Sequence, residues 1–475
     1  MPRRLLPVLL ALASAGVLAQ APPPYPVVFV HGLNSHDLAW RGVLEAVERA
    51  GWGVPYTYHA DLNASPSTGW ADDVVVAAPV PFRRFADGLT PDDSTVTVGT
   101  SAARRAPTES RVFVVNFRAY YDWDGGVVVV HSNRGAFGHS ESNEAAAVKQ
   151  GAALGAVVAD VVAWTGAPYV VLVGHSMGGL AIREYLQRRG PDGAPSWWVD
   201  PSDPDRGHRV ASVVTYGTPH GGSNASLLGL EAFVGVNPNS EAVRDLKYSF
   251  VSSGQTAPYL WGGTEGIRAW PAYHNNDVNA DGDADDVVAG LNEGDPHSRL
   301  SLDNTAMPLP LNVHYTYVTS TGDSVVDELR QGLWYRAVDG NLYLGPYGAP
   351  VRWVRTDVAH QNQTDDVATV VDAVTGPFRT VAAGDGPTGE AVSVGVWPNP
   401  ARGPVTLAYE LPEAASGRAT IRDALGRVVR TVEVVGRGGE GAVPFDVAGL
   451  AAGAYVVTLV ADGGGTATTV FTVAR

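Results

Sequence analysis

The pattern of apolar positions between residues 26 and 375 predicts strands and helices that alternate along the chain. Continuous apolar runs of about four to eight residues are typical of buried strands, whereas apolar residues at i, i+3 and i+4 are typical of helices with one buried face. Predicted strands cover residues 26–30, 111–117, 170–173, 210–216, 313–320 and 353–354. Predicted helices cover residues 41–49, about 142–166, 180–189 and 367–374. This alternation predicts an α/β fold with a mostly parallel, doubly wound sheet.

The period of the apolar pattern changes near the C-terminus. Four segments alternate between apolar and polar residues: 405–411, 427–434, 454–460 and 469–473. Because a period of two is typical of strands with one buried face, residues 393–475 are predicted to form a small all-β sandwich. The stretch 379–392, rich in Gly, Pro, Thr and Asp, is predicted to be a linker.

The N-terminus has the pattern of a secretory signal. Arg3 and Arg4 precede an apolar run that ends at Leu18, and small residues follow at the expected cleavage position. We therefore expect a signal peptide over residues 1–19 and a catalytic domain over residues 20–378. The run is too short to cross a membrane, and we expect no integral membrane span elsewhere.

Two stretches interrupt the predicted catalytic domain. Residues 61–110 are rich in Pro, Asp, Ser and Thr and show little periodicity. Residues 224–300 contain two helix-like stretches, at 227–234 and 240–250. Both are predicted to be insertions, and we expect them to contribute to a cap over the site.

Composition narrows the classes of function. The formal net charge is −16, which argues against nucleic acid as a partner. The chain contains no cysteine, so a thiol nucleophile, a thiolate zinc site and disulfide bonds are all excluded. Any nucleophilic chemistry must therefore use another side chain.

A Gly-x-Ser-x-Gly segment supplies that side chain. Gly174-His175-Ser176-Met177-Gly178-Gly179 follows a valine-rich predicted strand and precedes a predicted helix. Such a turn is strained and exposes the serine hydroxyl at the helix N-terminus, where N–H groups and the helix dipole favour an oxyanion. Ser176 is therefore the predicted nucleophile.

The order of the remaining candidate residues along the chain predicts the acid and the base. In a fold of this kind the acid and then the histidine follow the serine. Asp323 comes directly after the strand 313–320, at the edge of the sheet where the chemistry is expected, and Asp327 is the alternative acid. His360 is the only histidine after Asp323, so we predict that it is the general base.

An oxyanion needs two backbone N–H groups. One is expected from Met177, directly after the nucleophile, and the other from Leu33, in the turn after the first strand.

These segments resemble α/β-hydrolases of the lipase and esterase kind. The matching segments are His31-Gly32-Leu33-Asn34, the Ser176 segment, and Gly217-Thr218-Pro219-His220-Gly221-Gly222. The third is similar to a segment of bacterial triacylglycerol lipases and GPI-inositol-deacylase-like proteins, where it borders the acyl pocket. Thr321-Gly322-Asp323-Ser324-Val325-Val326 resembles their acid loop. The resemblance covers about residues 26–374.

The resemblance implies an α/β-hydrolase fold with cap insertions and a secreted serine ester hydrolase. The substrate is expected to be an ester or a lipid, cleaved through an acyl-enzyme with no cofactor for catalysis. The alternatives are an amidase or acyltransferase with the same triad, or a catalytically inactive binding or adhesion protein with the hydrolase fold. An intact triad argues against the inactive protein.

The C-terminal segment resembles the sorting domain of type IX secretion. Three motifs carry this resemblance: Trp397-Pro398-Asn399-Pro400, Asp423-Ala424-Leu425-Gly426-Arg427 and Leu450-Ala451-Ala452-Gly453-Ala454-Tyr455. It implies that the type IX machinery is a partner, and that the protein leaves a Gram-negative bacterium through the periplasm and outer membrane to become secreted or surface-bound.

An acidic loop is the last candidate site. Its spacing resembles an EF-hand calcium loop, although the position of the usual bidentate Glu is taken by Val288. The candidate oxygen ligands are Asp277, Asn279, Asp281, Asp283, Asp285 and Asp286. We expect a structural Ca²⁺ here; the alternative is an ordinary solvated turn.

Overall fold

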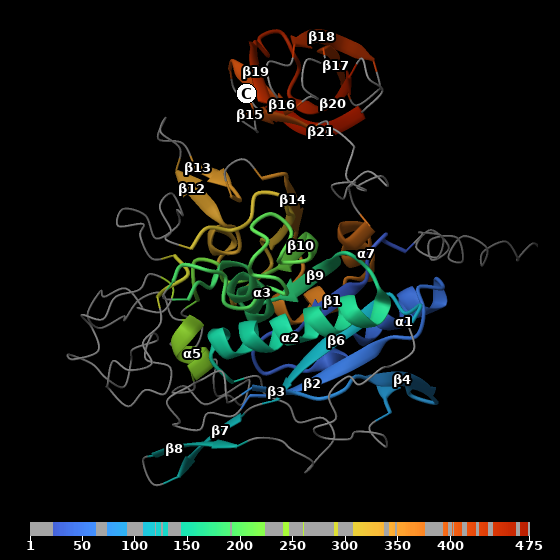
Figure 1. Cartoon of the computed structure of the whole chain (residues 1–475), viewed down its shortest axis with the longest axis vertical. Helices are drawn as coiled ribbons and strands as arrows, with labels where there is room; N and C mark the ends of the chain where they lie inside the picture. The colour runs from blue at the N-terminus through green and yellow to red at the C-terminus, as the bar shows by residue number, and fades with distance from the viewer. Residues whose placement is uncertain are drawn as a thin grey trace, which may run out of the picture. The chain divides into compact units, whose positions relative to one another are not determined.

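The computed structural model describes most of the chain between residues 22 and 473. The described ranges are 22–62, 74–92, 108–118, 120–124, 127–131, 144–190, 192–223, 241–246, 260, 289–292, 307–336, 342–346, 349–375, 393–397, 401, 403–410, 416–423, 427–435, 440–461 and 466–473. The chain divides into two compact units, Met1–Arg379 and Thr380–Arg475, and each is described by itself (Figure 1).

A ten-stranded sheet forms the centre of the first unit, in the order β14-β11-β10-β9-β1-β6-β2-β4-β5, with β3 beside β2. Its strands are β1 (Val27–Val30), β2 (Tyr56–Leu62), β3 (Val74–Val76), β4 (Val80–Phe85), β5 (Gly88–Pro91), β6 (Val112–Arg118), β9 (Val170–His175), β10 (Val210–Tyr216), β11 (His314–Ser320) and β14 (Val351–Thr356). From β14 to β2 every neighbouring pair is parallel. The predicted mostly parallel sheet is confirmed.

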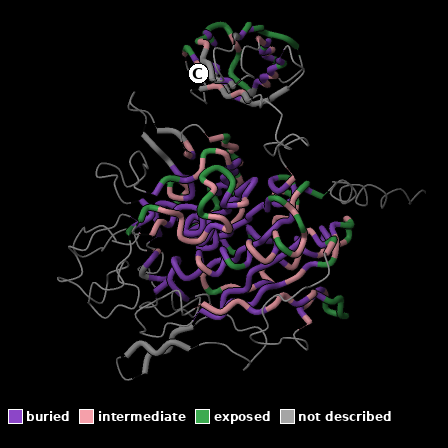
Figure 2. The backbone as a smooth tube through the Cα atoms, in the orientation of Figure 1, coloured by how far each residue is buried: buried purple, intermediate pink, exposed green. Residues whose placement is uncertain are grey.

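Helices cover both faces of this sheet. The main helices are α1 (Arg41–Arg49), α2 (Ala147–Thr165), α3 (Met177–Gln187) and α7 (Val367–Thr375). Leu154 of α2 and Ile182 of α3 belong to one buried cluster, whereas Val43 of α1 and Val370 of α7 belong to another. Because the two clusters contain different residues of the same strands, the sheet is doubly wound. Figure 2 shows the buried strands between the layers.

Three central strands of the sheet are buried along their whole length. Val27–Val30, Val170–His175 and Val210–Tyr216 have no exposed residue. A strand that is covered on both faces needs apolar side chains on both, which is why these segments appear in the sequence as continuous apolar runs.

The helix boundaries show where local sequence signals are sufficient to predict the ends of an element. The predicted helix over residues 41–49 is α1, with the same bounds. The predicted start of α2 near residue 142 is wrong, because the helix begins at Ala147. Ala146 has extended backbone angles and no capping side chain, and carboxylates from another helix, described below, bind the first N–H groups of α2.

The region 56–92 also differs from its prediction. β2, which lies between β6 and β4, was not predicted, because its buried polar residues interrupt the apolar pattern. His59 bonds to Asn116 at 3.2 Å, and Asp61 pairs with Arg118 at 2.9 Å. In the predicted insertion 61–110, the described part contains β3, β4 and β5, which extend the sheet edge.

Smaller elements complete the first unit. They are the 3-10 helices η1 (Asp37–Trp40), η6 (Glu328–Arg330) and η7 (His360–Asp365), helix α5 (Glu241–Leu246), and the hairpins β7–β8 (Tyr120–Asp124 and Val127–His131) and β12–β13 (Trp334–Arg336 and Leu342–Leu344). Helix α5 lies within the predicted stretch 240–250, whereas the predicted stretch 227–234 lies outside the described residues.

One described helix, α2, is long and apolar enough to cross a membrane, with a mean hydropathy of 1.3. It packs on the sheet, and 61% of the apolar window is buried in the unit. In Figure 1 α2 lies across the strands as a core helix, and core helices commonly meet the same criteria.

The second unit consists of two antiparallel sheets. Their strands are β15 (Ser393–Trp397), β16 (Val405–Glu410) and β19 (Glu440–Phe445), and β17 (Ser416–Asp423), β18 (Val428–Val435), β20 (Gly453–Ala461) and β21 (Thr466–Val473). Leu407 of the first sheet and Ile421 and Phe471 of the second belong to one buried cluster. The all-β prediction is confirmed, although β15, β17 and β19 were not predicted individually.

Candidate active site

Ser176 lies in a strained turn between β9 and α3. Its backbone angles are φ 52° and ψ −129°, which a residue with a side chain adopts rarely. Neighbouring glycines make the turn possible: a Cβ on Gly174 would lie 2.6 Å from the amide nitrogen of Gly179, and a Cβ on Gly178 would overlap the carbonyl oxygens of Val30 and His31. The turn therefore packs directly against the end of β1.

Three predicted residues come together at this turn. Ser176 Oγ lies 2.9 Å from His360 Nε2, and His360 Nδ1 lies 2.6 Å from Asp323 Oδ2. Ser176 follows β9, Asp323 follows β11 and His360 follows β14, strands that lie close together in the sheet order. Their carboxyl ends meet at one edge, where ligands bind in open α/β sheets.

The Asp323 carboxylate is buried and accepts four hydrogen bonds. Oδ1 accepts from the amides of Val325 at 2.8 Å and Val326 at 2.9 Å, while Oδ2 accepts from His360 and from Gln363 Nε2 at 3.1 Å. Burial acts to raise the pKa of Asp323, but the bond to His360 and the two backbone amides outweigh it, and its pKa lies below the ordinary value.

The alternative acid, Asp327, has a different place. Its Oδ1 accepts the amide of Leu329 at 3.0 Å and caps the 3-10 helix η6. It makes no hydrogen bond to His360 in the structure, so the geometry assigns the position beside the histidine to Asp323.

Two further histidines border the site in neutral form. His175 Nε2 donates to the carbonyl oxygen of His360 at 3.0 Å, and the two rings lie 4.8 Å apart. Burial, then repulsion from His360, lowers the pKa of His175 to about 3. His175 therefore holds the backbone that carries His360, a contact that sequence reasoning missed although His175 stands beside Ser176.

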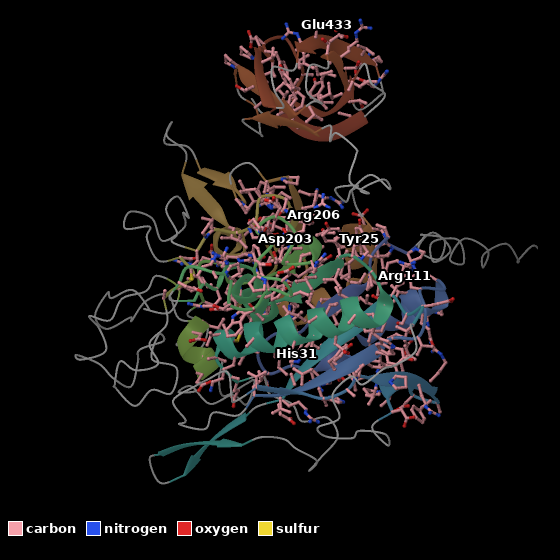
Figure 3. All side chains as sticks on the ribbon, viewed as in Figure 1. Tyr25, His31, Arg111, Asp203, Arg206 and Glu433 are labelled. Atoms are coloured by element: carbon pink, nitrogen blue, oxygen red, sulfur yellow. The ribbon has the colours of Figure 1, made fainter. Side chains whose placement is uncertain are left out.

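His31, labelled in Figure 3, holds the loop after β1. Its Nε2 accepts the amide of Phe117 at 3.0 Å, so Nδ1 carries the proton and donates to the carbonyl oxygen of Gly32 at 2.9 Å. Burial lowers the pKa of His31 to about 4. The ring therefore fixes the turn that leads to Leu33.

The two predicted oxyanion residues flank Ser176. Met177 is the first residue of α3, and Leu33 follows Gly32, at which an added Cβ would lie 2.7 Å from the Cβ of Ser176. Within the described ranges, no group accepts a hydrogen bond from the N–H of Leu33 or of Met177.

An apolar cluster surrounds these two residues. It contains Leu33, Ala147, Met177, Leu180, Ala242, Leu246, Leu260, Leu291 and Met307. Several of its members belong to the predicted insertion 224–300, so the described parts of that insertion pack directly on the residues beside Ser176.

Helix α5 is tied to α2 next to this cluster. Glu241 accepts the amide of Ala146 at 2.8 Å, and Asp245 accepts the amide of Ala147 at 2.7 Å. Glu241 also pairs with Lys149 at 2.9 Å, with both side chains buried. Carboxylates at a helix N-terminus satisfy free N–H groups and oppose the helix dipole, so α5 caps α2 from outside.

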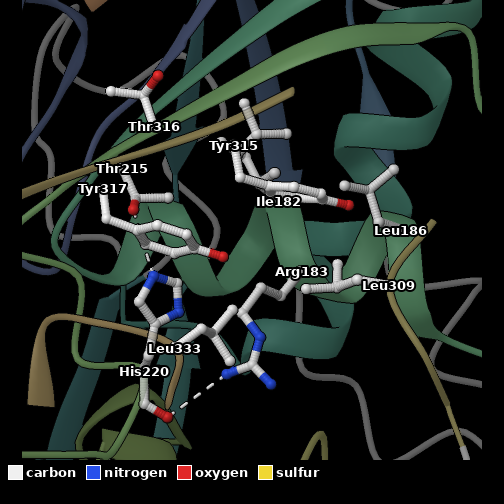
Figure 4. Close-up of a pocket in the computed structure, with 11 residues that line it drawn as sticks. Ile182, Arg183, Leu186, Thr215, His220, Leu309, Tyr315, Thr316, Tyr317 and Leu333 are labelled. Atoms are coloured by element: carbon white, nitrogen blue, oxygen red, sulfur yellow. Dashed lines mark hydrogen bonds between the residues drawn. The ribbon is translucent and has the colours of Figure 1, made fainter. Parts of the chain in front are cut away.

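The Gly217–Gly222 loop, predicted to border an acyl pocket, is tied to α3. Arg183 donates to the carbonyl oxygen of His220 at 3.4 Å, and Thr215 Oγ1 lies 3.3 Å from His220 Nε2 (Figure 4). A cavity of about 10 Å³ beside them is lined by Tyr315 and Tyr317. It has room for one water molecule at most, and neither Ser176 nor His360 lines it.

The predicted calcium site cannot be compared with the structure. Asp277, Asn279, Asp281, Asp283, Asp285 and Asp286 lie outside the described residues. In the described part of the chain, no group of three or more His, Asp or Glu side chains is placed to hold a metal ion. The calcium ligands and the signal peptide over residues 1–19 stay predictions.

The sheet order and the strained serine turn are those of an α/β-hydrolase fold. Comparison with solved structures gives weak likenesses to proteins of this fold. A Bacillus licheniformis lipase in propeptide form has 12% identity and a TM-score of 0.28 over 96% of this chain and 94% of its own. A Bacillus subtilis carboxylesterase has 10% identity and a TM-score of 0.27 over 75% and 84%. Because the identities and TM-scores are this low, the fold is assigned from the strand order of the sheet and the strained turn at Ser176.

The C-terminal unit has a clear family match. No curated protein matches the chain, but residues 395–473 match the model of the secretion system C-terminal sorting domain. The C-terminal unit is therefore a secretion sorting domain, and it marks the chain for export by type IX secretion to the cell surface or the extracellular space of a Gram-negative bacterium.

Proposed function

We propose that this chain is an exported serine ester hydrolase of the lipase or carboxylesterase class. Ser176 is the nucleophile, His360 the general base and Asp323 the acid that holds the histidine. The observation that carries the proposal is the continuous hydrogen-bonded chain from Ser176 Oγ through His360 to Asp323, on a strained turn at the N-terminus of α3.

The first half-reaction forms an acyl-enzyme. Ser176 Oγ bonds to the ester carbonyl carbon while its proton passes to His360 Nε2. The amides of Leu33 and Met177, with the positive end of the α3 dipole, stabilise the negative charge on the carbonyl oxygen. The carbon–oxygen bond to the alcohol then breaks, and the departing alcohol takes the proton from His360.

The second half-reaction releases the acid. Water attacks the acyl carbon and gives a proton to His360 Nε2, and the bond to Ser176 Oγ breaks as that proton returns to the serine. Asp323 keeps its charge throughout and holds the proton on Nδ1, so that Nε2 stays free to act as the base. The proton transfers balance within the triad, so the proposed cycle needs no cofactor.

The surroundings favour an ester with an apolar acyl group. The apolar cluster that contains Leu33 and Met177 lies beside the proposed oxyanion site. An acyl chain that contacts its partly exposed members, Leu33 and Leu246, would remove apolar surface from water, which contributes about 0.8 kcal/mol for each methylene group buried. We therefore expect activity to rise with acyl length over the first members of an ester series.

Active-site labelling and ester hydrolysis test this proposal. Purified protein is treated with a fluorophosphonate and then assayed with p-nitrophenyl esters of increasing chain length. Ser176→Ala and His360→Ala should each lose about 10⁴-fold or more in kcat/KM, and Ser176→Ala should lose the label. Ser202→Ala is the matched control, because Ser202 is exposed and bonds only within its own turn.

Three outcomes would contradict the proposal. Full activity in Ser176→Ala would exclude this nucleophile. Labelling followed by faster cleavage of an anilide than of the matching ester, or acyl transfer to an added alcohol in preference to water, would identify an amidase or a transferase. A wild-type chain that neither labels nor hydrolyses esters would be a binding protein with the hydrolase fold.

A further inference from the structure

We propose that Gln363 is a positioning residue of this site. It holds the Asp323 carboxylate in place, and by donating a hydrogen bond to it reduces how strongly its negative charge stabilises the protonated His360 ring. The catalytic part of this inference rests on the proposed function. Its structural part concerns only the contact between Gln363, Asp323 and His360.

Gln363 shares an acceptor atom with the proposed base. Its Nε2 donates to Asp323 Oδ2 at 3.1 Å, and the same oxygen lies 2.6 Å from His360 Nδ1. A carboxylate can only accept, so the NH₂ group of the amide must face it. Gln363 is 2% exposed and the Asp323 side chain is fully buried, so water does not compete for this oxygen.

The local helix explains why the two side chains converge. His360 and Gln363 both belong to the 3-10 helix η7 (His360–Asp365) and lie three residues apart. A 3-10 helix has about three residues per turn, so side chains at i and i+3 lie over one another. Both therefore reach the same carboxylate from one side.

The opposite wall leaves room for Gln363 only because residue 217 is glycine. A Cβ on Gly217 would overlap Gln363 Oε1 and would lie 3.0 Å from Asp323 Oδ2. Gly217 also has a φ of 50°, which a residue with a side chain rarely adopts. The turn after β10 thus encloses the amide against the acid.

Packing alone does not account for an amide here. Gln363 Oε1 is buried and has no hydrogen-bond partner in the described part of the chain. An unpaired buried polar atom is unfavourable, and methionine would fill the same volume without it. What the amide supplies, and methionine would not, is an N–H donor, which bonds to Asp323 Oδ2 at 3.1 Å and to the carbonyl oxygen of Val358 at 3.5 Å.

The donor has a predictable electrostatic effect. A hydrogen bond to a carboxylate spreads its negative charge and stabilises the ionised form. The charge that acts on His360 is then smaller, so the imidazolium is stabilised less. With the donor removed, Oδ2 serves His360 alone and stabilises the protonated ring more strongly.

Other charged groups lie on the elements around η7. They are His175 of β9, His36 and Asp37 at η1, Arg41, Glu45, Glu48 and Arg49 of α1, Asp327, Glu328 and Arg330 of the acid loop, and Asp357, Asp365 and Asp366 near His360. None of them changes in the variants proposed here, so a difference between variants reports the Gln363 contact.

The test is a histidine titration that needs no turnover. His360 is followed by NMR in protein labelled with ¹⁵N-histidine, and its signals are assigned by their loss in His360→Asn. In Gln363→Met the His360 signals should change at a higher pH than in the wild type, because the carboxylate beside the ring has lost a donor. Gln361→Met is the matched control: it makes the same change in the same 3-10 helix at an exposed position, and it should titrate as the wild type.

A second variant reaches the contact from the other side. Gly217→Ala keeps the amide in the chain but crowds both Gln363 Oε1 and Asp323 Oδ2, so it disturbs their contact and should move the His360 titration in the same direction. If Gln363→Met folds poorly, the His360 titration in Gly217→Ala still tests the inference. An unchanged His360 titration in whichever of the two variants is folded overturns the inference.

Kinetics separate this inference from the proposed function. In an active enzyme, the acid limb of kcat/KM in Gln363→Met should move to higher pH, so that the rate falls more below that limb than above it. An equal loss of rate at every pH would indicate a merely structural role and would overturn the inference. If the wild type neither labels nor hydrolyses esters but the titration shifts, the proposed function fails and the contact stands.

Discussion

Several polar residues around Ser176 are held in place by hydrogen bonds. His175 holds the carbonyl of His360, His31 holds the carbonyl of Gly32, and two backbone amides hold one oxygen of Asp323. A side chain held in this way keeps its working orientation before substrate arrives, which is the arrangement that catalysis by positioning requires. None of these contacts involves the sulfur of a cysteine, which the chain lacks.

The choice between the two acids can be tested at this scale. Asp323→Asn should reduce kcat by about 10⁴-fold, because an amide beside Nδ1 favours the wrong tautomer of His360. Asp327→Asn should have a small effect, since Asp327 only caps η6. The measurement is kcat for a p-nitrophenyl ester at neutral pH, with correct folding checked by circular dichroism. If the two variants exchanged these effects, Asp327 would be the acid.

At the scale of elements, the N-terminus of α2 depends on α5. The two carboxylates of α5 bind the amides of Ala146 and Ala147 at the start of α2, and the buried Lys149–Glu241 pair joins the helices. This contact lies beside the apolar cluster around Met177. The stability of the insertion and the shape of the proposed acyl site are therefore coupled.

Breaking that pair should destabilise the first unit. Glu241→Gln removes the buried carboxylate that pairs with Lys149 and accepts the amide of Ala146, so it should cost clearly more than the loss of an exposed pair. Glu328→Gln, which removes an exposed pair with Arg355, should cost about 1 kcal/mol or less. Urea unfolding of both variants measures the difference. Equal losses would show that the buried pair contributes no more than an exposed one.

At the scale of the whole molecule, buried neutral histidines make stability depend on pH. Burial lowers the pKa of His31 to about 4, of His175 to about 3 and of His314 to about 4. On unfolding each returns to about 6.5. Between the folded and unfolded pKa values the unfolded chain binds more protons, so stability is complete above about pH 6.5 and is lost as the pH falls.

The expected loss is large enough to measure. Each such histidine contributes about 1.4 kcal/mol per pH unit inside this window. Unfolding in urea at pH 7.5 and at pH 5.5 should therefore show a marked loss of stability at the lower pH. His314→Gln cannot take up the proton and should reduce the pH dependence by about one proton. An unchanged dependence in that variant would mean that His314 is already protonated in the folded state.

We expect ester hydrolysis to depend on the first unit alone and export to depend on the second. A chain that ends at Gly384 keeps the sheet, the triad and the apolar cluster, all of which lie in Met1–Arg379. It should retain its activity toward esters in solution but stay in the periplasm of its host, because it lacks the sorting domain. The measurements are kcat/KM of the purified chain and its distribution between periplasm and medium. Loss of activity on truncation would assign the C-terminal unit a part in catalysis.

Local sequence patterns determined the repeating parts of this protein. Continuous apolar runs predicted β1, β6, β9, β10 and β11, because a strand that is buried on both faces carries apolar side chains on both. The strained turn at Ser176 was equally predictable, since its glycines and serine are adjacent in the chain. The order of serine, acid and histidine could be read because it depends on succession along the chain and not on distance in space.

Tertiary structure alone decided the contacts between distant positions. The strand β2 was missed because its polar residues find buried partners on β6, and α2 begins late because its cap comes from α5, almost a hundred residues away. The preference for Asp323 over Asp327 beside His360, and the bond from Gln363 to the same carboxylate, depend on how the loops after β11 and β14 meet. Hydrogen bonds of this kind follow from geometry that the fold creates, so no local pattern in the sequence could specify them.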